Sequence, residues 1–222
     1  MIAGALVKIP DEQPIEELNN VVWGRSSGGF PLRSLIQFRP SLGGQSPDIQ
    51  EALAIHQEVR REWTIDEKDG VYSIVPQDVV STIWANIYIV QGLVIVDRTD
   101  NRGFVLDIIN NGLGRECAHQ VFLDSKAMAR DHSDQWMRGF SERRGRVDTG
   151  VLYGEGVEQD DVFGPELDRS ASQSVGWITR SFGEPTKVRV SPAGSVVVWS
   201  WPRIEQFIDF LRREVIIYMI SL

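Results

Sequence analysis

The sequence predicts an α+β protein in which two similar halves share an antiparallel sheet backed by helices. Residues 86–110 and residues 187–213 follow the same order: a strand, a glycine turn, a valine-rich strand, a polar break and an amphipathic helix. The turn glycines of the two segments are Gly92 and Gly194. Short hairpin connections favour antiparallel pairing, with the helices on one face of the sheet. We therefore expect an internal duplication.

The composition is that of an ordinary folded protein with an acidic balance of charge. Of 222 residues, 42% are hydrophobic and 24% are charged, which suffices for a proper core. We expect residues 1–114 to form the first α+β half and residues 115–222 the second, within one continuous globular unit. The net charge of −8 opposes general binding to phosphate backbones or anionic lipid. Because Cys117 is the only cysteine, an internal disulfide is excluded.

The sequence gives no sign of a membrane protein. Its start has no basic region followed by an apolar core, so no signal peptide is predicted. No run of about 18 apolar residues occurs, and we expect a cytoplasmic protein that makes no membrane contact. The apolar tail, residues 215–222, is too short to span a bilayer. We expect it to be a buried helix end, or a contact through which the chain joins an oligomer or complex.

The first half is predicted to alternate strands with short helices. Residues 2–9 are apolar and predict a strand, whereas the proline and early acids of residues 14–22 predict a short helix. Residues 24–29 are glycine-rich and predict a loop. Residues 32–38 alternate apolar and polar side chains with a period of two, which is typical of a strand.

Residues 46–61 contain the clearest helix start in the chain. Ser46 can cap, a proline follows at the first helical position, and an aspartate follows that. This predicts a helix to about residue 61. A hairpin over residues 63–75 is expected next, because Asp69 and the glycine after it form a favoured two-residue turn.

Capping residues predict the bounds of the remaining helices. Asp100 is expected to cap the helix of the first half, and Gly112 or Gly114 to end it. In the second half, Asp124 or Ser125 is expected to cap a helix that runs to about residue 142. The other predicted elements are a strand at 118–123, a strand at 147–153, an exposed acidic loop at 155–172, a strand at 175–182 and the closing helix from Ile204.

This duplicated order resembles the TATA-binding protein family. Phe30 and Pro31, followed by a strand, are similar to the family's Phe-Pro-Gly-Leu-Val strand, and the two strand–glycine–valine units are similar to its Ser-Gly-Lys-Leu-Val-Val segment. The resemblance implies a saddle-shaped sheet with helices on its back. Members of the family insert phenylalanines into the minor groove of DNA, and Phe30 is the residue that would do so here.

A sheet face rich in arginine is the candidate contact surface. Arginine suits phosphate and groove contacts through its planar guanidinium group. The expected contact residues for DNA or a protein partner are Phe30, Arg33, Gln37, Arg39, Lys187 and Arg189. The alternative is that these cations pair with the surplus acids as solvated surface charge. We expect the chain to be a non-enzymatic module that binds DNA or a protein through this face.

Three patterns in the sequence resemble enzyme or metal sites. Asp107, Asp124 and Lys126 have the residue types of a metal-dependent nuclease, although Asp124 is equally suited to cap a helix. Residues 24–28 match the Gly-x-Ser-x-Gly pattern of serine hydrolases without a helix after them. Cys117 and the histidine two residues later form a single short spacing, whereas structural zinc sites use paired ones. We therefore expect no catalytic site, metal or cofactor, with the nuclease or a structural subunit as alternatives.

Overall fold

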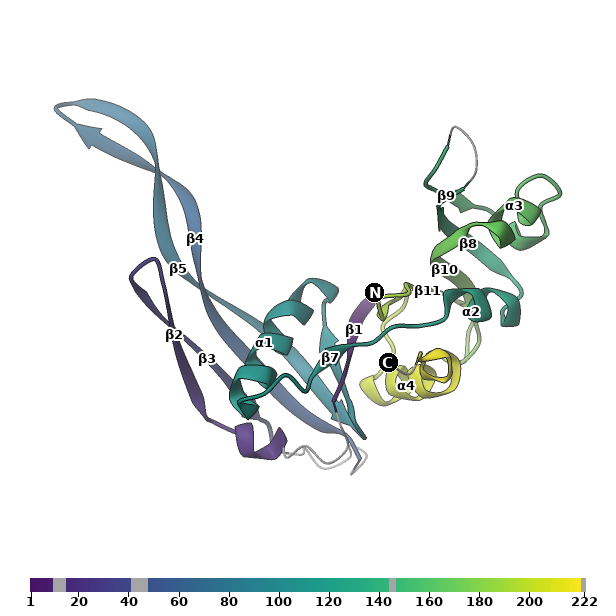
Figure 1. The fold of residues 1–222 in the computed structure, drawn as a ribbon, viewed down its shortest axis with the longest axis horizontal. Helices are drawn as coiled ribbons and strands as arrows, with labels where there is room; N and C mark the ends of the chain where they lie inside the picture. Colours follow the sequence, from purple (N-terminus) through teal and green to yellow (C-terminus); the bar gives the residue numbers. More distant parts are fainter. Residues whose placement is uncertain (10–14, 41–47, 144–146, 221–222) are drawn as a thin grey trace.

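A computed structural model describes residues 1–9, 15–40, 48–143 and 147–220 of the chain. Within these residues, twelve strands form one antiparallel sheet in the order β2-β3-β4-β5-β6-β1-β12-β11-β10-β8-β9, with β7 pairing β1 to the side of this path. The mixed α+β class is therefore confirmed (Figure 1). One hairpin projects far beyond the rest of the sheet.

The elements have the following bounds. The strands of the first half are β1 (Ile2–Lys8), β2 (Val22–Ser27), β3 (Phe30–Phe38), β4 (Gln50–Lys68), β5 (Val71–Val90) and β6 (Leu93–Asp97). Those of the second half are β7 (His119–Gln120), β8 (Gln135–Ser141), β9 (Gly150–Tyr153), β10 (Ala171–Thr179), β11 (Thr186–Val190) and β12 (Ser195–Val198). The α-helices are α1 (Arg102–Leu113), α2 (Ser125–Asp131), α3 (Gly164–Arg169) and α4 (Ile204–Phe210). The shorter helical turns are η1 (Ile15–Leu18), η2 (Thr99–Asn101), η3 (Val157–Gln159), η4 (Leu211–Val215, a π-helix) and η5 (Ile216–Tyr218).

Strand β1 lies at the centre of the sheet and joins the two expected halves. It pairs antiparallel with β6 on one side and with β12 on the other. Strands β6 and β12 are the valine-rich strands of the two similar segments, and their turn glycines both have positive φ, 75° at Gly92 and 71° at Gly194. Residues 1–114 and 115–222 therefore share one continuous sheet. The duplication itself stays a prediction.

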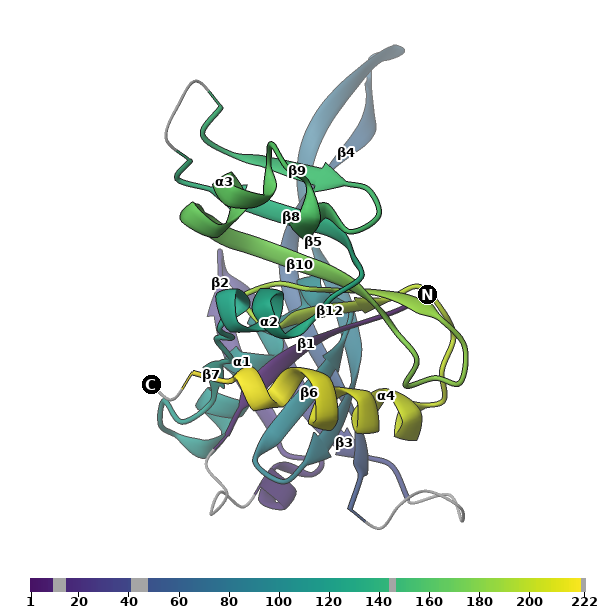
Figure 2. The same ribbon diagram turned by 90° about the vertical axis from the view of Figure 1, so that its right-hand side faces the viewer.

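The helices cover both faces of the sheet, not the single face that we expected. On β1, Leu6 belongs to the hydrophobic cluster that contains α4, whereas its neighbour Val7 belongs to the cluster that contains α1. The same split occurs on β6, where Ile95 joins the α4 cluster and Val94 the α1 cluster. Because successive side chains of a strand point to opposite faces, α1 and α4 lie on opposite sides, here named the α1 face and the α4 face. Figure 2 looks onto α4 and α2.

The predicted helix over residues 46–61 is wrong for residues 50–61, which belong to strand β4. The expected cap Ser46 lies outside the described residues. Strand β4 pairs with β3 on one side and β5 on the other, and this pairing outweighs the helix propensity of its alanines. Ala52 and Ala54 are fully buried in the α1 cluster. Their small side chains allow α1 to lie close to the sheet.

Four further elements differ from the sequence prediction. The expected loop at 24–29 is mostly strand β2, and the expected strand at 118–123 shortens to β7 with a bridge at Leu123. The expected helix to residue 142 ends at Asp131, because the chain turns at Asp134 (φ 60°) into β8, between β9 and β10. The expected acidic loop contains η3 and α3.

Most of the predicted turn and cap residues are confirmed. The β4–β5 turn has φ of 54° at Asp69 and 77° at Gly70, the two positive values of a type I′ hairpin turn. Gly114 ends α1 in the left-handed conformation. The carboxylate of Asp124 caps α2 by accepting hydrogen bonds from two backbone N–H groups. Asp100 does not cap α1, which has Asn101 at that position.

The C-terminal segment packs into its own chain. Val215 and Tyr218 are buried in the α4 cluster, and Met219 forms a β-bridge with Leu123. This agrees with the expectation of a buried helix end at Val215 and Tyr218, whereas Ile217 and Ile220 of the same tail are 64% and 50% exposed. Among the described residues, every helix is too short or too polar to cross a membrane.

Candidate functional site

Residues 57–68 of β4 and 71–82 of β5 form a largely exposed two-stranded arm. Strand β3 pairs with β4 only as far as His56, and β6 pairs with β5 only from Ile87. Beyond these points β4 and β5 pair only with each other, and the hairpin stands clear of the sheet (Figure 1). An isolated two-stranded hairpin is marginally stable in water. A long one therefore suggests that a partner covers it.

One face of the arm is apolar. Cross-strand partners share a face, and the pairs Ile65↔Ile74 and Trp63↔Pro76 lie on the same side as Val59↔Val80. The apolar side chains of this face are Val59, Trp63, Ile65, Tyr72, Ile74, Pro76 and Val80. The side chains of Trp63 and Ile65 are each 72% exposed, Ile74 71% and Tyr72 69%. Exposed apolar groups that gather on one surface mark interaction sites. We call this surface the arm face.

The charges of the arm are arranged around the arm face. With the turn residue Asp69 included, the arm has six acids and three bases, a net charge of −3, and five of these nine residues lie on the face opposite the arm face. Within the arm face, Arg61 Nε lies 3.2 Å from Asp78 Oδ1 and forms an ion pair with it. The centre of the arm face is therefore electrically balanced, whereas the whole arm is acidic.

The two edges of the arm differ. The free edge of β4, residues 57–68, has seven charged residues, whereas β5 has one, Asp78, between residues 71 and 86. Charged residues protect open strand edges from pairing with other chains. The β5 edge lacks this protection.

The predicted contact residues do not share one face. On β3, Leu32 and Ile36 are buried against the α1 face, so the exposed Arg33 and Gln37 point to the α4 face, and Phe30 points to the α1 face by the same alternation. Arg39 continues the α4-face row and pairs with Glu51 at 2.5 Å.

The two cations of β11 lie on the α1 face instead. Arg189 is opposite Val197 of β12, and Val197 is opposite Ala3 of β1, on the α1 side with Val7. Lys187 follows the same alternation. The single six-residue surface that we expected is therefore divided between the two faces of the sheet.

Lys187 and Arg189 lie in a cluster of aromatic rings. The Lys187 ammonium lies 5.1 Å from the centre of the Trp136 ring, and the Arg189 guanidinium 6.0 Å from that of Trp199. The two indoles meet edge to face at 5.1 Å, and Trp136 Nε1–H donates to the Val188 carbonyl at 3.1 Å. Neither cation forms an ion pair with a carboxylate in the described part of the chain. We call these four side chains the tryptophan–cation cluster.

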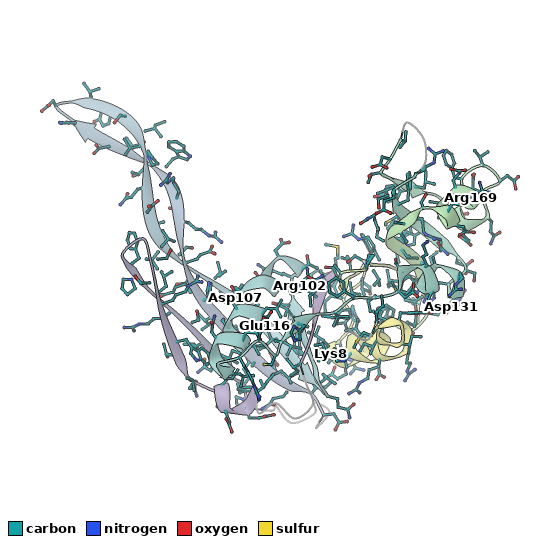
Figure 3. All side chains as sticks on the ribbon, in the orientation of Figure 1. Lys8, Arg102, Asp107, Glu116, Asp131 and Arg169 are labelled. Carbon is teal, nitrogen blue, oxygen red and sulfur yellow. The ribbon has the colours of Figure 1, made fainter. Side chains whose placement is uncertain are left out.

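The residues of the nuclease alternative are not brought together. Asp107 is on α1, on the α1 face, whereas Asp124 begins α2, which packs on the α4 face and ends at Asp131. Figure 3 labels Asp107 and Asp131 in separate parts of the molecule. Asp124 Oδ1 accepts two hydrogen bonds from backbone N–H groups of its own helix, those of Lys126 and Ala127. Asp124 therefore caps helix α2, the alternative role that the sequence predicted for it.

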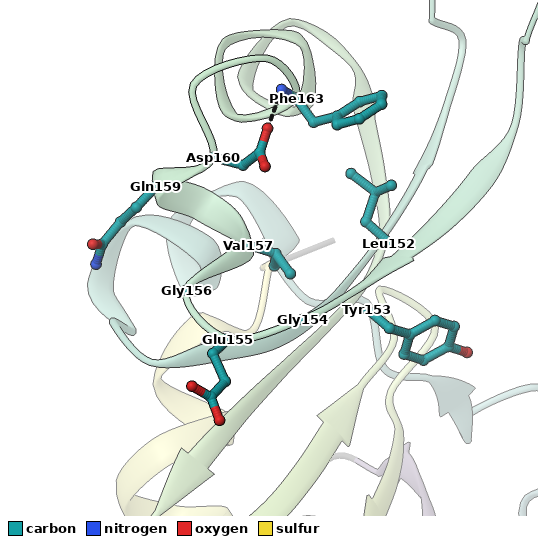
Figure 4. Close-up of a pocket in the computed structure, with 9 residues that line it drawn as sticks. All are labelled: Leu152, Tyr153, Gly154, Glu155, Gly156, Val157, Gln159, Asp160 and Phe163. Carbon is teal, nitrogen blue, oxygen red and sulfur yellow. Dashed lines mark hydrogen bonds between the residues drawn. The ribbon is translucent and has the colours of Figure 1, made fainter.

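The residues of the predicted zinc alternative also have a structural role. Cys117 is buried, and its N–H donates to Asn110 Oδ1 at 2.9 Å. Within the described ranges, no group of three His, Cys, Asp or Glu side chains is placed to hold a metal ion. A pocket of about 450 Å³ lies between β9, η3 and the start of α3 (Figure 4). Its Asp160 carboxylate accepts hydrogen bonds from the backbone N–H groups of Val162 and Phe163, so this acid is already used for local structure.

Sequence reasoning found the tip of the arm and missed its length. The turn at Asp69 was predicted, but residues 50–61 were assigned to a helix and the β5 segment was split into two units. The signal that was available is the period-two pattern of residues 59–65, in which Val59, Trp63 and Ile65 alternate with polar side chains. Comparison of the chain with protein-family models, with curated protein sequences and with solved structures found no match.

Proposed function

We propose that this chain is a non-enzymatic protein-interaction module that assembles through its arm, with the arm face of one copy packed against the arm face of a second copy. The observation that supports this most directly is the gathering of large apolar side chains on one side of an otherwise unsupported hairpin. Aromatic side chains such as Trp63 and Tyr72 dominate the energetics of protein interfaces. Covering them would also stabilise the hairpin.

The charges of the arm favour a second copy over nucleic acid. The arm is acidic overall and opposes phosphate backbones. The centre of the arm face is balanced, because Arg61 and Asp78 are its charges there, and Glu67 adds one negative charge near the tip. When two such faces meet about a two-fold axis, Arg61 of each copy can approach Asp78 of the other, which makes the surface complementary to itself. Two-fold homodimers are the commonest closed assembly of soluble proteins.

The first prediction concerns mass in solution. We expect the protein to elute as a dimer, with a mass twice that of the 25.0 kDa chain, and the double substitution Trp63→Ser with Ile65→Ser to make it monomeric. Multi-angle light scattering after gel filtration measures both. Because each of these side chains is 72% exposed in the single chain, the substitutions should leave its folding largely intact.

The matched control is the double substitution Glu62→Ser with Thr64→Ser on the opposite face of the same strand. It should stay dimeric. A wild-type protein that remains monomeric at every concentration would contradict the proposal, as would a dimer that survives the Trp63 and Ile65 substitutions. In the second case an interface elsewhere, such as the exposed Ile217 and Ile220 of the tail, would be responsible.

The tryptophan–cation cluster supports a second candidate function, the binding of single-stranded nucleic acid on the α1 face of β8–β12. Two of the three described α-helices of the second half, α2 and α4, pack on the other face. Trp199 is 44% exposed and the nearby Tyr153, stacked on Trp136, is 68% exposed. Aromatic rings with adjacent cations bind unpaired bases and the phosphates between them.

The second prediction is that oligothymidylate quenches the tryptophan fluorescence of the protein, and that Lys187→Ala with Arg189→Ala weakens this binding. Each lost phosphate contact should lower the slope of log affinity against log salt by about 1. The control is Arg33→Ala with Arg39→Ala, on the α4 face, which should change nothing. Equal losses in both variants, or no quenching at low salt, would contradict this second candidate.

A further inference from the structure

A pocket with both signs of charge lies between the edge strands and α1. It has a volume of about 330 Å³, which lies at the lower end of typical ligand sites. Strands β2, β3 and β4 and helix α1 contribute its lining residues, which are Trp23, Gly24, Arg25, Ser34, His56, Asp107, Ile108 and Asn111. Asp107 belongs to the nuclease pattern and Gly24 and Arg25 to the serine-hydrolase pattern, but neither pattern predicted their combination with His56 and Asn111.

His56, one of the lining residues, is a neutral histidine. Arg25 Nη2 lies 2.7 Å from His56 Nε2, and because a guanidinium group only donates, this ring nitrogen must accept. The ring proton is therefore on Nδ1, which donates to Ser34 Oγ at 2.7 Å. Burial, followed by the charge of Arg25, lowers the pKa of His56, in agreement with a neutral ring. The Ser34 hydroxyl accepts this bond and keeps its own proton for another acceptor.

Close packing against α1 holds two of the lining side chains in place. Phe104 of α1 stacks on His56, with 5.5 Å between ring centres. The Trp23 ring lies so close to α1 that a Cβ added at Gly112 would be 2.4 Å from Trp23 Cζ2. A glycine is therefore required at residue 112 for Trp23 to take this position.

Two opposite charges lie at the pocket without a charged partner. In the described part of the chain, neither Arg25 nor Asp107 has an oppositely charged side chain within 4.0 Å. Asn111 is one helical turn beyond Asp107 on α1 and adds an amide to the acidic side of the opening. Arg25 retains N–H groups beyond those that contact His56 and the Gln57 carbonyl.

We infer that this pocket binds a small zwitterion, with its carboxylate at Arg25 and its ammonium group at Asp107. The Ser34 hydroxyl donates to the carboxylate, and the Asn111 carbonyl oxygen accepts from the ammonium group. The apolar side chain of Ile108 lines the space between the two charged groups. Simple amino carboxylates match this chemistry. This inference does not rest on the proposed arm-face dimer or on the tryptophan–cation cluster, although Arg25 contacts the carbonyl of Gln57, the first residue of the arm.

Isothermal titration calorimetry with glycine, 3-aminopropanoate and 4-aminobutanoate tests the inference, because the three differ only in the spacing of their charges. At least one should bind, and acetate and methylammonium should bind it far more weakly. Arg25→Ala and Asp107→Asn should each weaken the binding by about tenfold or more, because each removes a charged hydrogen bond.

Asp107 is exposed on the helix surface, so Asp107→Asn keeps the fold and makes its result decisive. Asp66→Asn on the arm is the matched control and should bind as the wild type does. Three outcomes would overturn the inference: no heat with any of the three amino carboxylates, acetate binding as tightly as the best of them, or an unchanged affinity in Asp107→Asn.

Discussion

Replacing Phe207 by alanine should lower the free energy of unfolding by about 3–5 kcal/mol, the usual range for removing a buried phenylalanine ring. Phe207 of α4 is 1% exposed. It packs against β1 so closely that a Cβ added at Gly4 would lie 3.3 Å from its Cε1 atom. The cluster that it joins contains Leu6 and Ile95 from the first half together with Val196 from the second. The loss should therefore destabilise both halves in one transition.

Urea denaturation followed by circular dichroism gives the free energy, and hydrogen exchange of the amides in β3 and α4 shows whether the halves unfold together. Phe122→Ala is the control, because Phe122 is 42% exposed and its loss should cost less than about 1 kcal/mol. If Phe207→Ala accelerates exchange in α4 but leaves β3 unchanged, residues 1–114 and 115–222 are separate folding units and the single-unit description is wrong.

The parts of this fold that the sequence predicted well are set by neighbours along the chain. The Asp69 and Gly70 turn, the left-handed Gly114 and the Asp124 cap each depend on conformational preferences within four residues. A two-residue turn with positive φ at both positions allows few side chains, so the residue types identify it. The same holds for the short apolar strand β1.

The fate of residues 50–61 shows where local preferences fail. Alanine, glutamine and glutamate favour a helix, and the segment follows a plausible cap. Its conformation is set by β3 and β5, which pair with it on both sides. Ala52 and Ala54 are small because α1 lies over them, a requirement that comes from a helix about 50 residues later in the chain.

The candidate sites could be predicted only in part for a similar reason. Alternation within β3 correctly separates Arg33 from Ile36, and alternation within β11 correctly pairs Lys187 with Arg189. Whether these two rows share a face depends on the register across the seven strands from β3 to β11, where a shift of one residue exchanges the faces. The pocket at His56 likewise requires three strands and a helix to be in place.

Replacing Glu214 by alanine should have the second large effect, a loss of about 3 kcal/mol, because it leaves buried donors unpaired. The π-helical turn of residues 211–215 directs this carboxylate toward the end of β10. One oxygen accepts from Trp177 Nε1 at 3.0 Å, and the other accepts from Thr179 Oγ1 at 2.6 Å and from the Ser181 hydroxyl. Trp177 and Thr179 are buried, so water cannot readily replace the carboxylate.

Asp209→Ala is the control, because it removes an exposed carboxylate from the same helical segment without affecting the buried donors around Glu214. Asp209 is on the same helical segment, and its one ion pair among the described residues is with Arg213 at 3.4 Å, where both side chains are more than half exposed. Its loss should therefore cost less than about 1 kcal/mol. Glu214→Gln should lie between the two, because its amide keeps one acceptor oxygen for several donors. Equal melting temperatures of the Glu214→Ala and Asp209→Ala variants would show that the three donors find other partners. A clear separation would show that Glu214 joins the C-terminal segment to the sheet.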